Sequence, residues 1–133
     1  MINFLNISQK KRKTKFSLSM KIIKKPWGTE KIIEINDKYM LKKLTMLKNH
    51  RCSLQYHKSK VETIYVLKGK LKITMGSSQN NLSEKIYISG ESVTILPGII
   101  HRMEGMSESV YLESSTPEID DVIRLVDDYD RVN

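Results

Sequence analysis

The sequence predicts an all-β domain, in which antiparallel strands form a sandwich or a barrel closed on itself. Short runs rich in β-branched and aromatic residues recur along the chain, separated by glycine, proline, serine and asparagine. No long stretch shows the apolar spacing of an amphipathic helix, and there is no internal repeat. At 133 residues, the chain has the usual length of a single domain that buries a core without disulfides.

The expected strands begin after Pro26-Trp27-Gly28 and follow one another at short intervals. Turns are expected at Gly69, at residues 76–81, at Ser89-Gly90 and at Pro97-Gly98. The runs that we expect to form strands are residues 30–35, 38–47, 52–57, 62–67, 70–75, 82–88, 93–96, 100–104 and 109–114.

The two ends of the chain differ from this middle part. Residues 1–19 are polar and basic without sustained periodicity, so we expect a flexible arm, or an extension upstream of a start at Met20. An arm that binds nucleic acid or another partner is the alternative, and residues 20–133 form the expected domain. Near the other end, Thr116-Pro117-Glu118 could start one or two helical turns. We therefore expect a short helical or irregular tail over residues 119–125.

The formal net charge of +8 is spread unevenly along the chain. It is +5 in residues 1–19, +10 in residues 20–103 and −7 in residues 104–133. A basic body suits an anionic small molecule such as a sugar phosphate. Nucleic acid would suit the charge equally, but the chain has no aromatic-rich basic patch and no known nucleic-acid motif. We expect a small-molecule partner, and an ordinary lysine-rich surface is the alternative.

Cysteine usage and hydropathy indicate the compartment. Cys52 is the only cysteine, so an intramolecular disulfide is excluded and a reducing compartment, the cytoplasm, is the simplest expectation. We expect Cys52 to be a small buried strand residue rather than a reactive thiol. No apolar run approaches the roughly 18 residues of a membrane span. The short apolar run of residues 1–5 precedes the basic cluster, so we do not expect a secretory signal.

Four polar residues on strand-like sequence carry the main functional signal. Gln55 and His57 are two positions apart in an extended run and therefore point to the same face. Glu62 opens the next β-rich run, and His101 follows a turn that ends another. Imidazole nitrogens with carboxylate and amide oxygens are typical of one divalent metal site. On residue types alone, four unrelated polar residues remain the alternative.

The expected ion is divalent. Two neutral imidazoles, one carboxylate and one amide give a ligand charge of only −1, so the ion stays Lewis acidic toward a bound oxygen. Zn²⁺ is our first expectation, and Mn²⁺, Fe²⁺ or Ni²⁺ suit the same donors.

The spacing of these donors resembles that of a known superfamily. The cupins have two motifs, which this chain resembles in Gln55-x-His57-x₄-Glu62-x₆-Gly69 and Gly90-x₆-Pro97-Gly98-x₂-His101. Further segments narrow the resemblance to small single-domain cupins related to the C-terminal domain of type II mannose-6-phosphate isomerases, over residues 22–132. These segments are Lys25-Pro26-Trp27-Gly28, Leu54-Gln55-Tyr56-His57, residues 116–125 and residues 127–131.

The resemblance implies a single cupin barrel, or double-stranded β-helix jelly roll, with a metal ion inside its mouth. It implies that Gln55, His57, Glu62 and His101 occupy the four ligand positions, since glutamine is common at the first of them. It also implies a sugar-phosphate substrate and a homodimer formed through sheet edges.

Departures from the family pattern concern substrate recognition rather than the ligands. His57 is followed by Lys58-Ser59-Lys60, where relatives commonly continue with histidines and an arginine. Lys60 keeps the charge but lacks the bidentate fork of arginine. The usual asparagine after the last ligand motif is Gly105, and the usual glycine near the end is Asp130.

The resemblance points to Arg124 and Arg131 as substrate phosphate ligands, with Lys60 and Lys43 as helpers. For both arginines the alternative is pairing with the acids around them, which are Asp120, Asp121, Asp127, Asp128 and Asp130.

The base that an isomerase needs is left open by the sequence. The residues on offer are His50, Glu104 and Glu113, besides a hydroxide on the ion. Trp27 could stack on a sugar ring, but we expect it in the core. Tyr56 lies between two ligands, so we expect it to point away from the site.

Three functions are weighed on these grounds. The leading expectation is a metal-dependent sugar-phosphate isomerase that interconverts mannose 6-phosphate and fructose 6-phosphate through an enediol. The alternative is a non-catalytic, metal-containing cupin that binds a sugar or metabolite, favoured by the altered run after His57 and the lack of a nucleotidyltransferase domain in the 133 residues. A metal oxygenase is third. Iron oxygenase sites prefer more histidine ligands, and here Gln55 occupies one of the four ligand positions.

Overall fold

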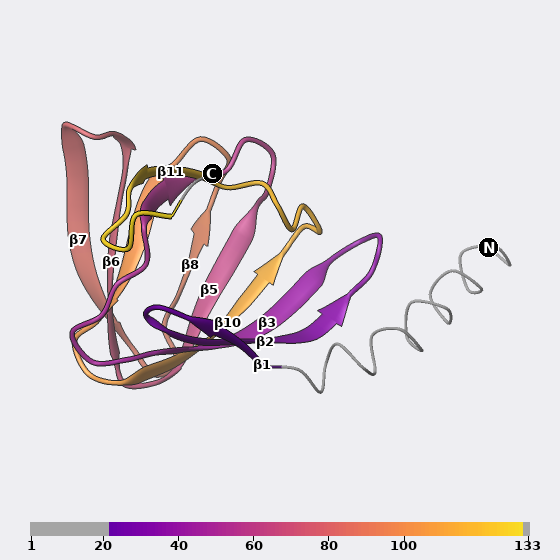
Figure 1. Cartoon of the computed structure of the whole chain (residues 1–133), viewed down its shortest axis with the longest axis horizontal. Coiled ribbons are helices and arrows are strands. Elements are labelled where there is room, and N and C mark those ends of the chain that lie inside the picture. Colours follow the sequence, from indigo (N-terminus) through magenta and orange to yellow (C-terminus); the bar gives the residue numbers. More distant parts are fainter. Residues whose placement is uncertain (1–21, 132–133) are drawn as a thin grey trace, which may run out of the picture.

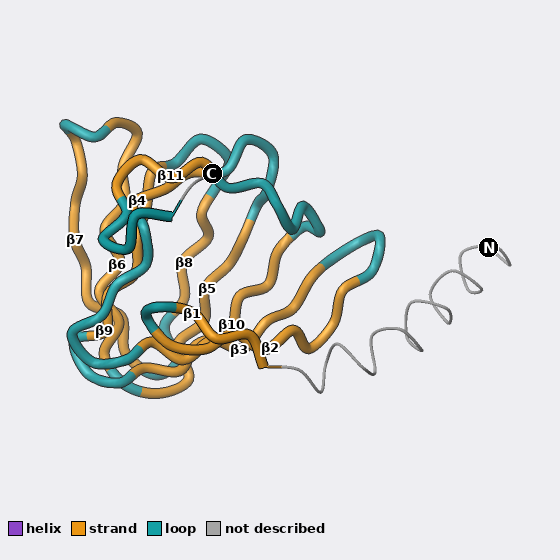
Figure 2. The backbone as a smooth tube through the Cα atoms, viewed as in Figure 1, coloured by secondary structure: helices purple, strands orange, loops and turns teal. Residues whose placement is uncertain are grey.

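The computed structural model describes residues 22–131, which form eleven strands and no helix (Figure 2). The strands are β1 Ile22–Lys25, β2 Gly28–Ile35, β3 Met40–Met46, β4 Leu54–Tyr56, β5 Glu62–Lys68, β6 Lys70–Ser78, β7 Asn81–Ile88, β8 Ser92–Ile95, β9 Ile100–Gly105, β10 Ser109–Ser115 and β11 Ile123–Val126. The expectation for residues 1–19 lies outside the described residues.

Two antiparallel sheets face each other (Figure 1). One has the strand order β1-β2-β3-β10-β5-β8 and the other the order β11-β4-β9-β6-β7. Strands distant in the sequence are therefore neighbours, as in a jelly roll: β10 lies between β3 and β5, and β9 lies between β4 and β6. The expected all-β jelly-roll barrel is confirmed.

Alternation of side chains gives the barrel an apolar core. Along β3, Met40, Lys42, Leu44 and Met46 are buried while the residues between them are not. The core cluster is Trp27, Leu44, Met46, Cys52, Ile64, Val66, Leu71, Ile73, Tyr87, Ile95, Met103 and Tyr111. Burial of this apolar surface holds the two sheets together and leaves polar side chains at one end of the interior.

The turn after β5 depends on a glycine. Gly69 has φ +88°, and a Cβ there would lie 2.4 Å from the carbonyl oxygen of Glu108. Both the positive φ and the close approach of backbone require glycine. The last residue of the first motif thus shapes the barrel and lies outside the ligand set.

Every expected run contains a strand, with shifts of a few residues at the ends. The structure adds β1 and β11. Of the two alternatives for the tail, the helical turns are wrong: residues 116–122 are irregular, and residues 123–126 pair as β11 with β4. Pairing with β4 provides hydrogen bonds for the backbone of this segment. An isolated helix of one or two turns would be marginally stable.

Candidate metal centre

Three buried side chains from different parts of the chain meet inside the barrel. Glu62 is the first residue of β5, His101 is the second residue of β9, and His57 directly follows β4. Their exposed fractions are 2 %, 0 % and 2 %, respectively. Burial of an acid and two imidazoles this complete is rare unless they hold each other or an ion.

One carboxylate oxygen lies between the two imidazoles. Glu62 Oε1 is 3.2 Å from His57 Nε2 and 3.0 Å from His101 Nε2. The ring centroids are 5.1 Å apart, and the three donor atoms all lie within 4.8 Å of one another. A small cation placed among them could contact all three after slight adjustment, since typical Zn–N and Zn–O distances are about 2.0–2.2 Å.

The Nδ1 atoms of the two imidazoles form hydrogen bonds that fix the orientation of the rings. His57 Nδ1 donates to the carbonyl oxygen of Asp121, and His101 Nδ1 donates to that of Ile99 at 2.9 Å. A neutral ring that keeps its proton on Nδ1 turns its Nε2 lone pair toward Glu62. Nε2 of His101 is buried and has no hydrogen-bond partner. In this tautomer, two imidazole lone pairs and a carboxylate oxygen face one another without a hydrogen between them. These three atoms are suitable ligands for a divalent metal ion.

Gln55 can add a fourth ligand. It lies opposite His101 in the pairing of β4 with β9 and lines the cavity. The hydroxyl of Ser53 donates to Gln55 Oε1 at 2.6 Å, which orients the amide. An amide oxygen has a second lone pair, and this one stays available to an ion.

The charge state of Glu62 suits a ligand role. Burial works to raise its pKa. Hydrogen bonds from His101 and His57, when their Nε2 atoms carry a proton in place of an ion, and the charge of Lys60 outweigh burial. The pKa of Glu62 is therefore held well below its usual value, and the side chain is a carboxylate at neutral pH.

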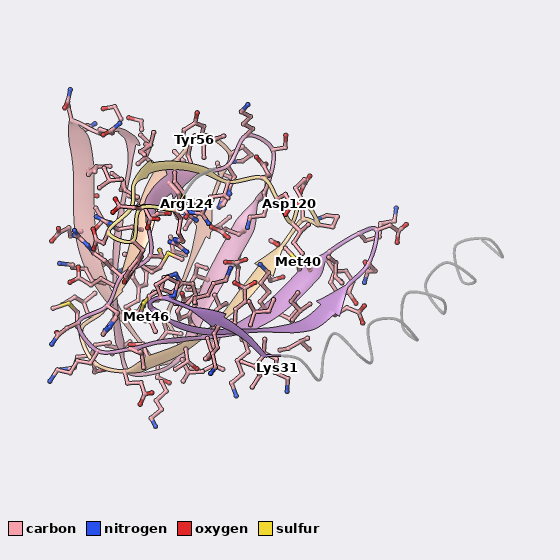
Figure 3. All side chains as sticks on the ribbon, in the orientation of Figure 1. Lys31, Met40, Met46, Tyr56, Asp120 and Arg124 are labelled. Atoms are coloured by element: carbon pink, nitrogen blue, oxygen red, sulfur yellow. The ribbon has the colours of Figure 1, made fainter. Side chains whose placement is uncertain are left out.

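A cavity of about 450 Å³ opens beside this centre. Gln55, His57 and Trp27 are among the residues that line it. Asp120 and Arg124, from the segment that leads into β11, also line the cavity and are labelled in Figure 3. Trp27 belongs to the core cluster, as expected, and also faces the cavity.

Another part of the cavity lining consists of charged side chains that pair with one another. We call it the charged wall, and it comprises Lys25, Glu30, Lys42, Glu113 and Lys60. Lys42 Nζ is 2.8 Å from Glu30 and 3.9 Å from Glu113, and Lys60 Nζ is 3.5 Å from Glu113. Lys60 continues the series to Glu62 Oε2 at 3.4 Å. Lysine and glutamate side chains therefore alternate from β1 to the metal centre. Their opposite charges nearly cancel, so little net charge is buried.

Glu113 occupies the middle of this wall. It is 6 % exposed, and its Oε2 makes no hydrogen bond among the described residues. Burial, followed by the nearby charge of Glu62, raises the pKa of Glu113 to about 7. A carboxyl group in this environment can exchange a proton near neutral pH.

Of the expected phosphate ligands, the structure brings Arg124, Arg131 and Lys60 to the cavity. Lys43 is exposed on the outer face of β3, and its neighbour Lys42 lines the cavity instead. Lys42 shares the parity of the apolar Met40, Leu44 and Met46, a signal that was available in the sequence.

Arg131 already has a carboxylate partner. Its guanidinium donates twice to Asp127, at 2.9 and 3.0 Å, and lies over the ring of Tyr129. The alternative of pairing with a nearby acid thus holds for Arg131, although the residue also lines the cavity.

The three candidate bases differ in where they lie relative to the cavity. His50 is exposed and its Nδ1 lies 2.9 Å from the carbonyl oxygen of Lys48. Glu104 pairs with Lys72 at 3.4 Å, away from the cavity lining. Only Glu113 of the three lines the cavity. Cys52 is buried as expected, and burial raises the pKa of its thiol to about 11, so it is an inert core residue.

Comparison with known proteins identifies the family. The family described as mannose-6-phosphate isomerase C-terminal matches residues 11–127. The chain belongs to this family. The mannose-1-phosphate guanylyltransferase of Escherichia coli K12 is 31 % identical over 113 residues, which are 81 % of this chain and 23 % of that protein. The chain therefore spans about a quarter of the length of this relative.

Among the described residues, no helix is both long and apolar enough for a membrane crossing.

Solved structures support the fold. The capsular polysaccharide assembling protein CapF from Staphylococcus aureus matches with a TM-score of 0.70 and 19 % identity, over 80 % of this chain and 34 % of that one. An RmlC-like cupin from Shewanella frigidimarina matches with a TM-score of 0.66 and 16 % identity, over 75 % of this chain and 86 % of that one. The chain thus has the jelly-roll fold of these structures and belongs to the mannose-6-phosphate isomerase C-terminal family.

Proposed function

We propose that this chain is a metal-dependent sugar-phosphate isomerase that interconverts an aldose and a ketose phosphate of the mannose 6-phosphate and fructose 6-phosphate type. The observation that carries the proposal is the meeting of His57, Glu62 and His101 beside a cavity lined with charged residues. The family description adds support.

The ligand set that we propose is Gln55, His57, Glu62 and His101, with Zn²⁺ as the first candidate ion. When bound, such an ion would act as a Lewis acid on the carbonyl and neighbouring hydroxyl of the sugar. The chain itself orients both imidazoles through backbone carbonyls. Lys60, 3.4 Å from Glu62 Oε2, helps to keep Glu62 ionised against the effect of burial.

Isomerisation also requires a proton to move between C1 and C2 of the sugar. We assign this step to Glu113, because it is the candidate base that lines the cavity. Its Oε2, which makes no hydrogen bond among the described residues, would take the proton from one carbon and return it to the other. Lys42 and Lys60, both within 4 Å of that oxygen, balance the charge of the carboxylate.

Phosphate would be held at the open end of the cavity. Arg124 and Arg131 line this region, and Lys60 adds charge from the wall. The pairing of Arg131 with Asp127 fixes the guanidinium in place, so that only part of its donor capacity serves a substrate.

The proposal is tested by metal analysis together with a coupled isomerase assay. Purified protein should carry about one divalent ion per chain, and His57→Ala should lose it. The exposed His50→Ala variant is the matched control and should keep its metal. Glu113→Gln should keep its metal but lower kcat by about 10²–10⁴-fold, as for loss of a general base.

Two results separate the parts of this proposal. Protein that binds no divalent ion under any loading condition would overturn metal dependence. Protein that binds an ion yet turns over no hexose phosphate would overturn the isomerase activity and leave the metal centre intact.

A second candidate function is a non-catalytic cupin that binds a sugar or metabolite. The mutual pairing of the charged wall favours it, because Lys42 and Lys60 are balanced by acids without any substrate. A thermal shift with a sugar or sugar phosphate, without product, would support this function. A homodimer and a cytoplasmic location stay predictions from the family and the composition.

A further inference from the structure

One segment near the end of the described chain contributes several residues to the cavity lining. We call residues 117–126 the C-terminal strap; it runs over the ends of the strands in Figure 1 and contains Asp120 and Arg124, both labelled in Figure 3. Its end, β11, pairs with β4, where Arg124 lies opposite Gln55. The strap therefore forms part of the cavity and is attached to the strand that carries a proposed ligand.

Asp121 joins the strap to the metal centre through two separate groups. Its backbone carbonyl accepts the Nδ1 proton of His57. Its carboxylate accepts the backbone N–H groups of Lys58, Ser59 and Lys60 at 2.9, 2.7 and 2.9 Å. Both contacts reach more than 60 positions back along the chain.

The loop held by this carboxylate connects two of the proposed ligands. Residues 58–60 start directly after His57 and end two residues before Glu62. Three backbone donors fix the loop around one side chain, so the distance between the two ligands is set partly from the strap. The backbone hydrogen bonds from Lys58, Ser59 and Lys60 also lower the pKa of Asp121, which keeps the carboxylate ionised at neutral pH.

We propose that Asp121 is a positioning residue, which couples the C-terminal strap to the orientation and tautomer of His57. This inference rests on the proposed metal site. A strap in place holds the His57 proton on Nδ1 and directs Nε2 to the ion. A displaced strap releases the ring and the 58–60 loop together.

A purely structural loop cap would require only the side chain. Asp121 also supplies the backbone carbonyl that accepts the Nδ1 proton of His57. Carbonyl and carboxylate groups in this position orient metal-bound histidines in many proteins. Because Ile119, Asp120, Val122 and Arg124 of the strap line the cavity, a sugar bound there would contact the segment that aligns the metal ligand.

The experiment compares Asp121→Ala and Asp121→Asn with wild type. Asp128→Ala is the matched control, because Asp128 docks the same tail on Arg51 without contacting His57. Long-range ¹H–¹⁵N spectra of metal-free protein read the His57 tautomer directly. Affinity for Zn²⁺ is measured by competition with a chromophoric chelator, and the visible spectrum of the Co²⁺-loaded protein reports ligand geometry.

Wild type should show a proton held on Nδ1 of His57. Asp121→Ala should show a mixture of tautomers, bind Zn²⁺ about 10–100-fold more weakly and give a changed Co²⁺ spectrum. Asp121→Asn keeps one oxygen acceptor and should lie between the two. Asp128→Ala should match wild type in all three measurements.

An unchanged His57 tautomer and an unchanged Zn²⁺ affinity in both Asp121 variants would overturn the coupling. Equal losses in Asp128→Ala would also overturn it, because they would show a general effect of tail docking. If wild type itself binds no metal, the proposed function fails, and the tautomer spectrum still decides whether Asp121 positions His57.

Discussion

Two groups of buried polar side chains, the charged wall and the metal centre, use similar chemical groups in opposite ways. On the charged wall, each ammonium group faces a carboxylate, and Lys42 and Glu30 are only 2.8 Å apart. On the metal side, two imidazole lone pairs and a carboxylate oxygen face one another. The first arrangement balances its own charge, whereas the second requires a cation. Buried polar residues thus indicate a metal only where their acceptors converge without donors.

The largest expected effect comes from removing the shared acceptor of the metal side. Glu62→Gln should reduce the bound metal from about one ion per chain to background, because the neutral amide supplies weaker donation and no charge. Lys60 keeps Glu113 as a partner, so the charged wall should persist. Elemental analysis after dialysis checks this. Full metal retention would place the ion elsewhere.

The next effect tests the opposite side. Lys42→Met leaves Glu30 and Glu113 buried without their shared cation and should lower the free energy of unfolding by about 3–5 kcal/mol. Metal binding should survive. Urea denaturation measures the change, and Lys43→Met, one residue away on the outer face, should stay within about 0.5 kcal/mol of wild type. Equal effects of the two substitutions would contradict the inward placement of Lys42.

A smaller effect is expected from the residue that orients Gln55. Ser53→Ala removes the hydroxyl that donates to Gln55 Oε1 and should weaken Zn²⁺ affinity by about 10–100-fold. Ser115→Ala removes another buried hydroxyl, which bonds the carbonyl of Thr116, and should leave Zn²⁺ affinity unchanged. Competition titration with a chelator compares them. Equal affinities of wild type and Ser53→Ala would argue against Gln55 as a ligand.

The smallest effect lies outside both walls, in the docking of the tail. The hydrogen bond from Arg51 lowers the pKa of Asp128. A lowered pKa adds stability that is complete above the ordinary pKa of about 3.8 and is lost as pH falls through the folded-state value. Wild type should therefore lose about 0.2–1 kcal/mol more than Asp128→Asn between pH 5 and pH 3, in urea unfolding. Parallel pH profiles would show that this pair does not stabilise the fold.

Most of the barrel could be predicted because apolar alternation and turn residues are local signals. The strands β1 and β11 could not: each has four residues at the edge of a sheet, and β11 depends on pairing with β4. The choice between Lys42 and Lys43 was readable from the parity of Met40, Leu44 and Met46, but two adjacent lysines obscure it.

The site was only partly predictable for the same physical reason. Spacing within the two motifs indicated His57, Glu62 and His101, which the structure brings together. The selection of Glu113 depends on which acids share the cavity, and the role of Asp121 depends on contacts more than 60 positions away. No local pattern carries information about such contacts.

The place of Asp121 in the chain also bears on the order in which the centre is completed during synthesis. A nascent polypeptide that ends at Ser115 already contains every proposed ligand side chain and all strands except β11. It still lacks the carbonyl that holds the proton of His57 and the carboxylate that fixes the loop after it. If the centre binds an ion as we propose, its final geometry would be reached only after residue 121 has been translated.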